Sequence, residues 1–348
     1  MDKFRDKIFN ANVFEKYLTT LPSTKENSMI KNGLFTVVNK YKSRMSEQTG
    51  GYAVNEPIKG RLTGTPVNYD GNTNIPAGAE RDTFYQRKIC YGRAQAWGEY
   101  DFAADITGTN FMAEAQEVKD FWDEQRQATV LSILKGIFSM EGGVNGQFVS
   151  KHTYDISNAS ETKLSADSLN KAAQKALGDK KAKLDVIFMH SAVSTNLEGL
   201  NLINFLKYTD ADGIERDLTI GTFNGRLVIV DDDMPVETVE DSLGDYNLYT
   251  SYVFQKGFFE YENIGAEVPT ELYRDAYTKG GKTDLISRVR EMIVPMYISY
   301  KGTGTVSPTN SNFETGSNWE LANNDKVGIN KVYVDDKLIP VARVISRG

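Results

Sequence analysis

The longest apolar pattern in the chain lies between residues 110 and 139. Phe111, Ala115, Val118 and Trp122 recur at intervals of three and four residues, which is the spacing of one face of an α-helix. After Val130, apolar residues occur nearly all round the helix. The pattern predicts one spine helix within residues 110–139, and residues 111–138 would form a rod about 42 Å long. Its cap is Thr109 or Asn110, and Gly142-Gly143 is its predicted end. The expected core positions are Phe111, Val118, Trp122 and Leu134.

The segment before this helix has a different pattern. Residues 49–82 hold six glycines, counted from Gly50 to Gly78, and three prolines. That is too long for an ordinary connection and too poor in apolar residues for a domain. We therefore expect a protruding hairpin-like loop, and residues 84–102, which alternate apolar and polar side chains, as its returning strand. Its expected contacts with other subunits are Arg61, Tyr69, Asp70, Asn72 and Asn74.

The rest of the chain mixes short strands and helices. Apolar runs predict strands at 184–189, 226–230, 249–254, 258–261 and 289–299. Helices are expected over 166–177 and from a Ser191 cap to about residue 206. A strand pair is expected after Gly146, and another at 331–334 with 337–345. There is no internal repeat, and the order differs from a βαβ nucleotide-binding fold, so the sequence predicts an α+β protein.

The charge balance narrows the class of partner. Forty Lys and Arg against 47 Asp and Glu give a net charge of −7, which argues against a surface built to bind nucleic acid. Residues 1–50 alone carry +4. We therefore expect a basic arm, with Lys3, Arg5 and Lys7, to contact acidic positions of a neighbour's spine. Those positions are Glu117, Asp120 and Glu124. No apolar run could span a membrane, and the N-terminus has no signal sequence.

Candidate chemical motifs fail on spacing. Gly280-Gly281-Lys282-Thr283 lacks the earlier glycine and the strand that a phosphate loop requires. His190-Ser191 with residues 231–233 (three aspartates) lacks a nucleophile elbow, and those aspartates lack a calcium-loop spacing. Cys90, the single cysteine, fits a strand position. We predict no catalytic residues, no metal and no cofactor; a hydrolase using His190 is the enzyme alternative.

Four stretches, in this order, resemble the major capsid proteins of tailed bacteriophages with the HK97-like fold. GEYDFAADITGTN at 98–110 resembles the segment leading into that family's spine helix, and VIFMHSAVSTNLEGLNLINFL at 186–206 resembles its axial strand–helix unit. GTFNGRLVIVDDDMP at 221–235 resembles the next strand and acidic turn. Residues 252–300, which include GKTDLISRVREMIVPMYISY, resemble the return to the peripheral domain. The similarity covers residues 50 to 300.

The resemblance implies an N-terminal arm (1–48), an extended loop (49–102), a peripheral-domain spine (103–145), an axial domain sharing strands with the peripheral one (146–265), and a return with a C-terminal segment (266–348). It implies an icosahedral shell subunit that assembles as hexamers and pentamers around double-stranded DNA, without sequence-specific binding. A portal and a separate scaffolding protein are the expected partners. The resemblance also implies that the subunit assembles in the host bacterial cytoplasm and becomes part of the virion. The alternatives are a nanocompartment shell of the same fold, or a tail-tube or sheath subunit.

Overall fold

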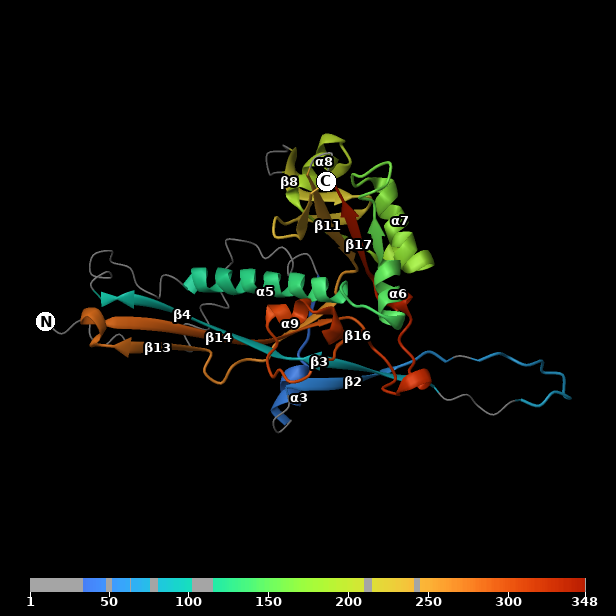
Figure 1. Cartoon of the computed structure of the whole chain (residues 1–348), viewed down its shortest axis with the longest axis horizontal. Coiled ribbons are helices and arrows are strands. Elements are labelled where there is room, and N and C mark those ends of the chain that lie inside the picture. Colours follow the sequence, from blue (N-terminus) through green and yellow to red (C-terminus); the bar gives the residue numbers. More distant parts are fainter. Residues whose placement is uncertain are drawn as a thin grey trace.

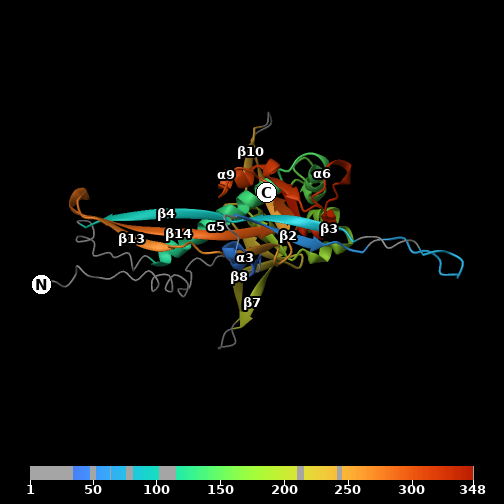
Figure 2. The same ribbon diagram turned by 90° about the horizontal axis from the view of Figure 1, so that it is seen from below.

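The computed structural model describes residues 34–47, 52–62, 64–75, 81–101, 115–209, 215–240 and 245–347. Its main elements are two mixed sheets and one long helix. The molecule is elongated, with the loop between β2 and β3 at one end and the turn between β13 and β14 at the other (Figure 1). Viewed at right angles, β10 and the β7–β8 hairpin project in opposite directions (Figure 2). The structure is therefore a body from which several slender extensions emerge.

The first sheet is five-stranded and forms the long base of the molecule. β14 is its centre: β4 pairs along one edge, and β12 and then β13 pair along the other. β1 joins the outer side of β12 in parallel. The strands are β1 (Phe35–Val37), β4 (Tyr91–Tyr100), β12 (Phe259–Asn263), β13 (Thr270–Asp275) and β14 (Lys282–Pro295).

The second sheet has eight strands, in the order β5-β17-β11-β6-β9-β8-β7, with β10 paired to β11. β6 and β9 are parallel neighbours, and β17 lies between β11 and β5. The strands are β5 (Thr153–Asp155), β6 (Val186–Met189), β7 (Ile203–Thr209), β8 (Glu215–Phe223), β9 (Arg226–Val230), β10 (Val236–Val239), β11 (Tyr246–Phe254) and β17 (Val341–Ser346).

Helices cover these sheets, and two small strand pairs complete the body. α5 lies along the five-stranded sheet, whereas α7 and α8 pack on the eight-stranded one. The two-stranded pairs are β2 (Ala53–Lys59) with β3 (Thr83–Ile89), and β15 (Ile298–Tyr300) with β16 (Trp319–Leu321). The helices are α3 (Tyr41–Glu47), α5 (Ala115–Ile137), α6 (Gly143–His152), α7 (Ala166–Leu177), α8 (Ser191–Gly199) and α9 (Asn310–Glu314).

One hydrophobic core joins the two sheets through the second half of α5. Val130, Ile133 and Ile137 are fully buried between residues of both sheets. At Gly136 a Cβ atom would lie 1.8 Å from the Phe313 carbonyl oxygen, so only glycine lets the α9 segment cross the helix here. The spine therefore holds the two sheets to each other.

The predicted spine helix is present over the described residues, but its predicted end is wrong. α5 ends at Ile137, and Gly142 and Gly143 have φ of 75° and 50°. These two glycines begin α6, which occupies the place after Gly146 where a strand pair was expected. Phe148 and His152 are buried on α6, and this packing outweighs the low helix propensity of its glycines. The predicted boundaries at 145 and 146 thus fall inside a helix.

Three other local predictions are wrong. His190, not Ser191, is the N-cap of α8, because its Nδ1 accepts from the Ala192 amide. That helix ends at Gly199 rather than near residue 206. The predicted strand pair of 331–334 with 337–345 is not formed. β17 pairs instead with β11 and β5, so residues 266–348 return to both sheets. In 331–334, Tyr333 forms an isolated bridge with Asn323.

Candidate inter-subunit contact site

The loop between β2 and β3 is the most exposed part of the described chain. β2 and β3 form a continuous ladder from Ala53↔Ile89 to Lys59↔Thr83, and Gly60 N donates to Asp82 O at its outer end. Beyond that point apolar side chains face solvent: Leu62 is 67% exposed, Ile75 76% and Tyr69 91%. Within the described chain nothing covers these three apolar side chains of the loop.

Asp70 gives the tip of this loop a defined shape. Its Oδ1 accepts hydrogen bonds from the backbone amides of Asn72 and Thr73 at 2.9 and 2.7 Å. Its Oδ2 accepts from the Thr73 hydroxyl and from the side-chain amide of Asn68. The hydrogen bonds from Asn72 and then Thr73 lower the pKa of Asp70 to about 2. Asp70 therefore stays ionised, and its oxygens stay acceptors, at neutral and mildly acidic pH. Arg61 and Asn74, also predicted contacts, are exposed.

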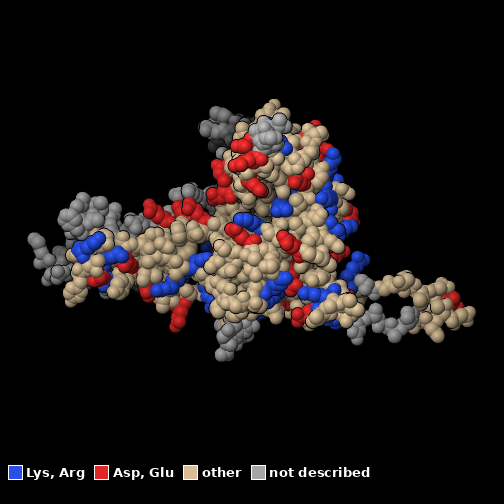
Figure 3. All heavy atoms as spheres, viewed as in Figure 1, with Lys and Arg blue, Asp and Glu red and all other residues tan. Residues whose placement is uncertain are grey.

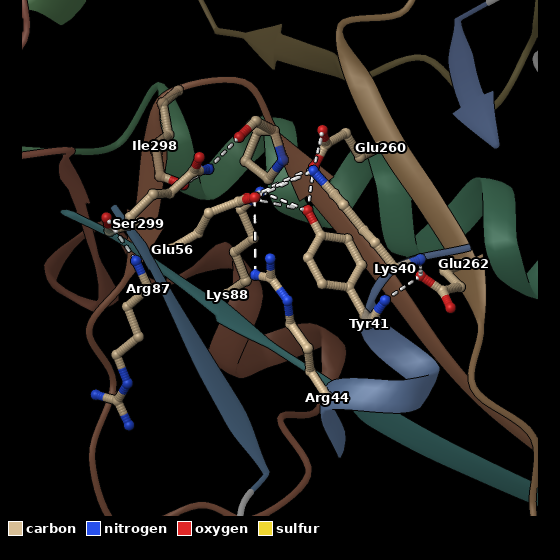
Figure 4. A network of polar contacts seen from close by, with 12 residues as sticks. Lys40, Tyr41, Arg44, Glu56, Arg87, Lys88, Glu260, Glu262, Ile298 and Ser299 are labelled. Atoms are coloured by element: carbon tan, nitrogen blue, oxygen red, sulfur yellow. Dashed lines mark hydrogen bonds and ion pairs between the residues drawn. The ribbon is translucent and has the colours of Figure 1, made fainter. Parts of the chain in front are cut away.

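An ion cluster closes the base of the loop (Figure 4). Lys88 of β3 is 3% exposed, and its Nζ contacts Glu56 Oε2 of β2 and lies 2.8 Å from Glu260 Oε2 of β12. It also donates to the Tyr41 hydroxyl, which in turn contacts Glu260. Lys40 Nζ approaches the same two carboxylates from the solvent side, 3.3 Å from Glu56 and 3.0 Å from Glu260. Arg44 Nη1 is 3.8 Å from Glu56 Oε1, so three cations surround two carboxylates at one junction.

The electrostatics of the cluster favour its charged form. Burial alone would raise the pKa of Glu260, but hydrogen bonds from Lys88 and Tyr41 outweigh it and lower the pKa to about 2. Burial would likewise raise the pKa of Glu56. Lys88, and after it Lys40, outweigh this effect, so the pKa of Glu56 is also lowered. Burial and the neighbouring Glu260 raise the pKa of Tyr41. The cluster therefore links the loop to the five-stranded sheet by fully ionised pairs.

α3 is attached at the same junction by the buried carboxylate of Glu262. Its Oε2 accepts from the amides of Lys40 and Tyr41 at 3.0 and 2.7 Å, and its Oε1 from the Lys42 amide at 2.8 Å. A carboxylate from another element thus takes the place of an N-cap side chain. Together with β1, it fixes residues 34–47, the last part of the predicted N-terminal arm, to the five-stranded sheet.

The spine helix is attached to the five-stranded sheet by polar contacts within an apolar interface. Trp122 Nε1 donates to Ser287 Oγ at 2.9 Å, and Arg126 binds both oxygens of Glu291 at 2.6 and 3.2 Å. Burial alone would lower the pKa of Arg126, but Glu291 outweighs it and raises the pKa. Both partners are on β14, so α5 is held in one register on the sheet.

The predicted acidic face of the spine is only partly defined by the structure. Glu117 and Glu124 are exposed and Asp120 is half-buried. Of the predicted core positions, Val118, Trp122 and Leu134 are buried. Phe111 and the arm residues Lys3, Arg5 and Lys7 lie outside the described residues.

Geometry disfavours the candidate catalytic motif. His190 Nδ1 accepts from the Ala192 amide at 3.1 Å, so this nitrogen cannot also take a proton from Ser191 Oγ, 3.5 Å away. Asp232 Oδ1 is 3.8 Å from the other ring nitrogen. Lys282-Thr283 begins β14 rather than a helix, contrary to a phosphate loop. Within the described ranges, no group of His, Cys, Asp or Glu suits a metal ion, and no helix could span a membrane.

Comparison with known proteins identifies the fold of this architecture. No family model matches the chain. The chain is 28% identical over 302 residues to the major capsid protein of Bacillus phage SPP1, covering 86% of this chain and 87% of that protein. Its fold is similar to the Cyanophage Pam1 capsid asymmetric unit, with a TM-score of 0.55, 9% identity and 94% of each chain covered. The fold is HK97-like.

A second capsid structure gives the same result. The acidic stable capsid of Helicobacter pylori bacteriophage KHP30 matches with a TM-score of 0.51 and 11% identity over 90% of this chain and 88% of that one. The predictions of an α+β HK97-like fold and of a phage head shell subunit related to tailed-phage major capsid proteins are thereby confirmed. These relatives give no support to a nanocompartment or tail-tube subunit.

Sequence reasoning missed the residues that hold the HK97-like loop in place. The sequence pattern did contain a signal for Lys88. Every second residue of a strand lies on the same face, and this face holds Phe84, Gln86, Lys88 and Cys90. A lysine on a strand face that also carries Phe84 and Cys90 indicates a buried partner. The partner Glu260, 172 residues away, has no comparable signal in the sequence.

Proposed function

We propose that this chain assembles as hexamers and pentamers into the icosahedral shell of a phage head, enclosing double-stranded DNA. The observation that carries the proposal is the loop between β2 and β3, whose apolar side chains Leu62, Tyr69 and Ile75 are exposed although the loop is firmly attached at its base. A neighbouring subunit would cover them. Many such contacts, each repeated by symmetry, close a shell from weak individual interfaces.

In this proposal the two sheets take different places in the shell. We infer that the five-stranded sheet with α5 is the peripheral domain and that the eight-stranded sheet is the axial domain, which meets its copies around symmetry axes. The basic arm, with Lys3, Arg5 and Lys7, would lie on a neighbour's Glu117, Asp120 and Glu124. This arrangement is supported by the exposure of Glu117 and Glu124.

The remaining partners follow from the same role. The net charge of −7 suits a container whose wall does not bind packaged DNA tightly, so DNA is enclosed without sequence-specific contacts. A portal and a separate scaffolding protein would act during assembly in the host cytoplasm. The chain would carry out no catalysis and would need no cofactor. Tight, salt-sensitive binding of DNA by isolated subunits would contradict this reading of the wall.

Electron microscopy of the purified chain tests the function directly. We expect closed shells or capsomers from the parent chain, and tubes or monomers would contradict the proposal. Deleting residues 61–80 should abolish shells while leaving the far-ultraviolet circular dichroism nearly unchanged, because the deletion removes only the loop beyond the β2–β3 ladder.

A triple variant separates the loop surface from the loop backbone. Replacing Leu62, Tyr69 and Ile75 by serine should also abolish shells. Val306→Ser is the matched control, because Val306 is 70% exposed but lies away from the loop. Shells from the triple variant would show that the loop makes no essential apolar contact.

A further inference from the structure

One end of the eight-stranded unit is strongly acidic. Residues 231–245 contain seven Asp and Glu and neither Lys nor Arg. They run from the end of β9 through β10 to the start of β11, and Asp232, Asp233, Glu237, Glu240 and Asp245 are exposed. Neither Glu237 nor Glu240 makes an ion pair with a described residue. Glu237 and Glu240 therefore keep uncompensated negative charge within the described part of the chain.

Another part of the same unit is basic. The outer face of α7 and the 3-10 segment η2 (Gly178–Lys183) hold five lysines against two aspartates: Lys171, Lys175, Lys180, Lys181 and Lys183 with Asp167 and Asp179. Lys171 pairs with Asp167 on the helix surface. Lys181 and Lys183 are exposed and form no ion pair with any residue that the structure describes. The basic end thus keeps free positive charge.

Strand topology places these two charged segments at opposite ends of the unit. Lys183 lies just before β6, and Asp231 lies just after β9. The two strands are parallel and in register from Val186↔Leu227 to Met189↔Val230. The basic segment is therefore at the amino ends of the pair and the acidic turn at the carboxyl ends.

The β10 strand extends the acidic end further. It pairs with Tyr246–Tyr249 of β11, beyond the Tyr252↔Phe188 pairing with β6, so Glu237 and Glu240 lie farther out on the same side. In Figure 3 red side chains gather on the left of the upper unit and blue ones along its right edge. The unit is thus polarised across its width.

We propose that the basic end of one copy, at Lys181 and Lys183, binds the acidic end of the next copy, at Glu237 and Glu240. This inference rests on the proposed function and specifies how neighbouring axial units meet. A contact between two different patches of the same chain is heterologous, and it generates rings when its rotation closes. Opposite charge at such a contact steers encounter and fixes which surfaces meet. Because each end is complementary to the other, a second copy of the chain satisfies both.

Charge exchange tests the contact. Variant A carries Lys181→Glu and Lys183→Glu, so both ends are acidic; variant B carries Glu237→Lys and Glu240→Lys, so both are basic. Neither should form capsomers at low salt, as measured by sedimentation and electron microscopy. A chain with all four changes has the charges exchanged and should recover shells. All these positions are exposed, so circular dichroism should match the parent.

A mixture of A and B gives a sharper result. The two variants can only alternate, and alternation closes rings of even number, so hexamers should form but pentamers and closed shells should not. Normal shells from A or B alone, or no recovery in the fourfold variant, would overturn the proposal. So would normal assembly of A combined with loss of binding to a DNA duplex, which would assign the basic end to DNA. Failure of the unaltered chain to assemble would count against the proposed function instead.

Discussion

Lys88 shows how a single residue can decide the position of a whole loop. Its ammonium group is almost completely removed from water, yet it faces Glu56, Glu260 and the Tyr41 hydroxyl. A buried charge is tolerated only when its partners are complete, and removing one partner leaves the others buried without a counter-charge. The three acceptors come from β2, β12 and α3, so one side chain joins three segments.

Replacing Lys88 by methionine should therefore be severe. The side chain keeps its length and apolar stem, but Glu56 and Glu260 lose their buried partner, so we expect a loss of about 3–5 kcal/mol in unfolding free energy. Lys40→Met is the matched control. Lys40 reaches the same carboxylates but is 36% exposed, so its loss should cost less than about 1 kcal/mol. Equal effects in urea titrations would contradict the special role of Lys88.

The pKa of Glu260 predicts an acid-sensitive contribution to stability. Its folded pKa of about 2 lies below the ordinary 4.5, so its stabilising effect is complete above about pH 4.5 and is lost as the pH falls toward 2. The sign follows because the unfolded chain binds the proton more readily. At neutral pH Glu260→Gln should lower the unfolding free energy by roughly 2–3 kcal/mol.

Urea titrations of both proteins between pH 7 and pH 2 check this dependence. The difference between the parent and Glu260→Gln should shrink through the window from pH 4.5 to 2. A difference independent of pH would show that the glutamate acts by shape rather than by charge. Glu271→Gln, a change at an exposed ion pair with Arg288, serves as control and should show little effect at either pH.

At the scale of elements, α5 shows what periodicity can and cannot predict. The three-and-four spacing correctly predicted a helix with Val118 and Trp122 facing the sheet, because side-chain burial alone sets that spacing. The end of the helix depended on a distant segment. At Gly316 a Cβ atom would lie 1.8 Å from the Ser139 carbonyl oxygen, so the chain near residue 316 occupies the path that a longer helix would need. No local pattern encodes that contact.

Trp122 should be the most sensitive position in the first half of α5. Trp122→Ala removes a buried indole and its hydrogen bond to Ser287, and we expect a loss of about 3–5 kcal/mol. Trp122→Phe keeps most of the apolar surface and leaves Ser287 without its donor, which should cost about 1–2 kcal/mol. Thermal and urea unfolding measure both. If the two variants lost the same amount, the indole nitrogen rather than the ring would carry the interface.

The whole molecule depends on pairings between remote segments that sequence patterns do not reveal. β1 pairs with β12 across 224 residues, Phe35 with Phe259, and β17 pairs with β5 across 190 residues, Arg343 with Thr153. Both short strands look ordinary by themselves. The resemblance to capsid proteins correctly supplied the HK97-like fold, whereas the physical pattern alone reached only a mixed α+β order.

The same pairings change where the N-terminal arm can be cut. The predicted arm ended at residue 48, but Leu34, Phe35 and Tyr41 are buried in the core. Deleting residues 1–33 should leave a folded subunit with a nearly unchanged melting temperature that does not form shells. Deleting residues 1–45 removes those buried side chains as well and should lower the melting temperature by roughly 5–10 °C, as expected for a loss of several kcal/mol. Normal particles from the shorter deletion would refute the role of the arm in assembly.

β17 also has a consequence for biosynthesis. Residues 153–155 and 249–254 leave the ribosome long before residues 341–346, which pair with both. A nascent chain therefore cannot complete the eight-stranded sheet until residue 346 has been made, and closing such remote contacts is slow. On a messenger translated by many ribosomes, unfinished neighbours would lack a complete unit and could not join one another. Topology thus delays polymerisation until translation has passed the last strand.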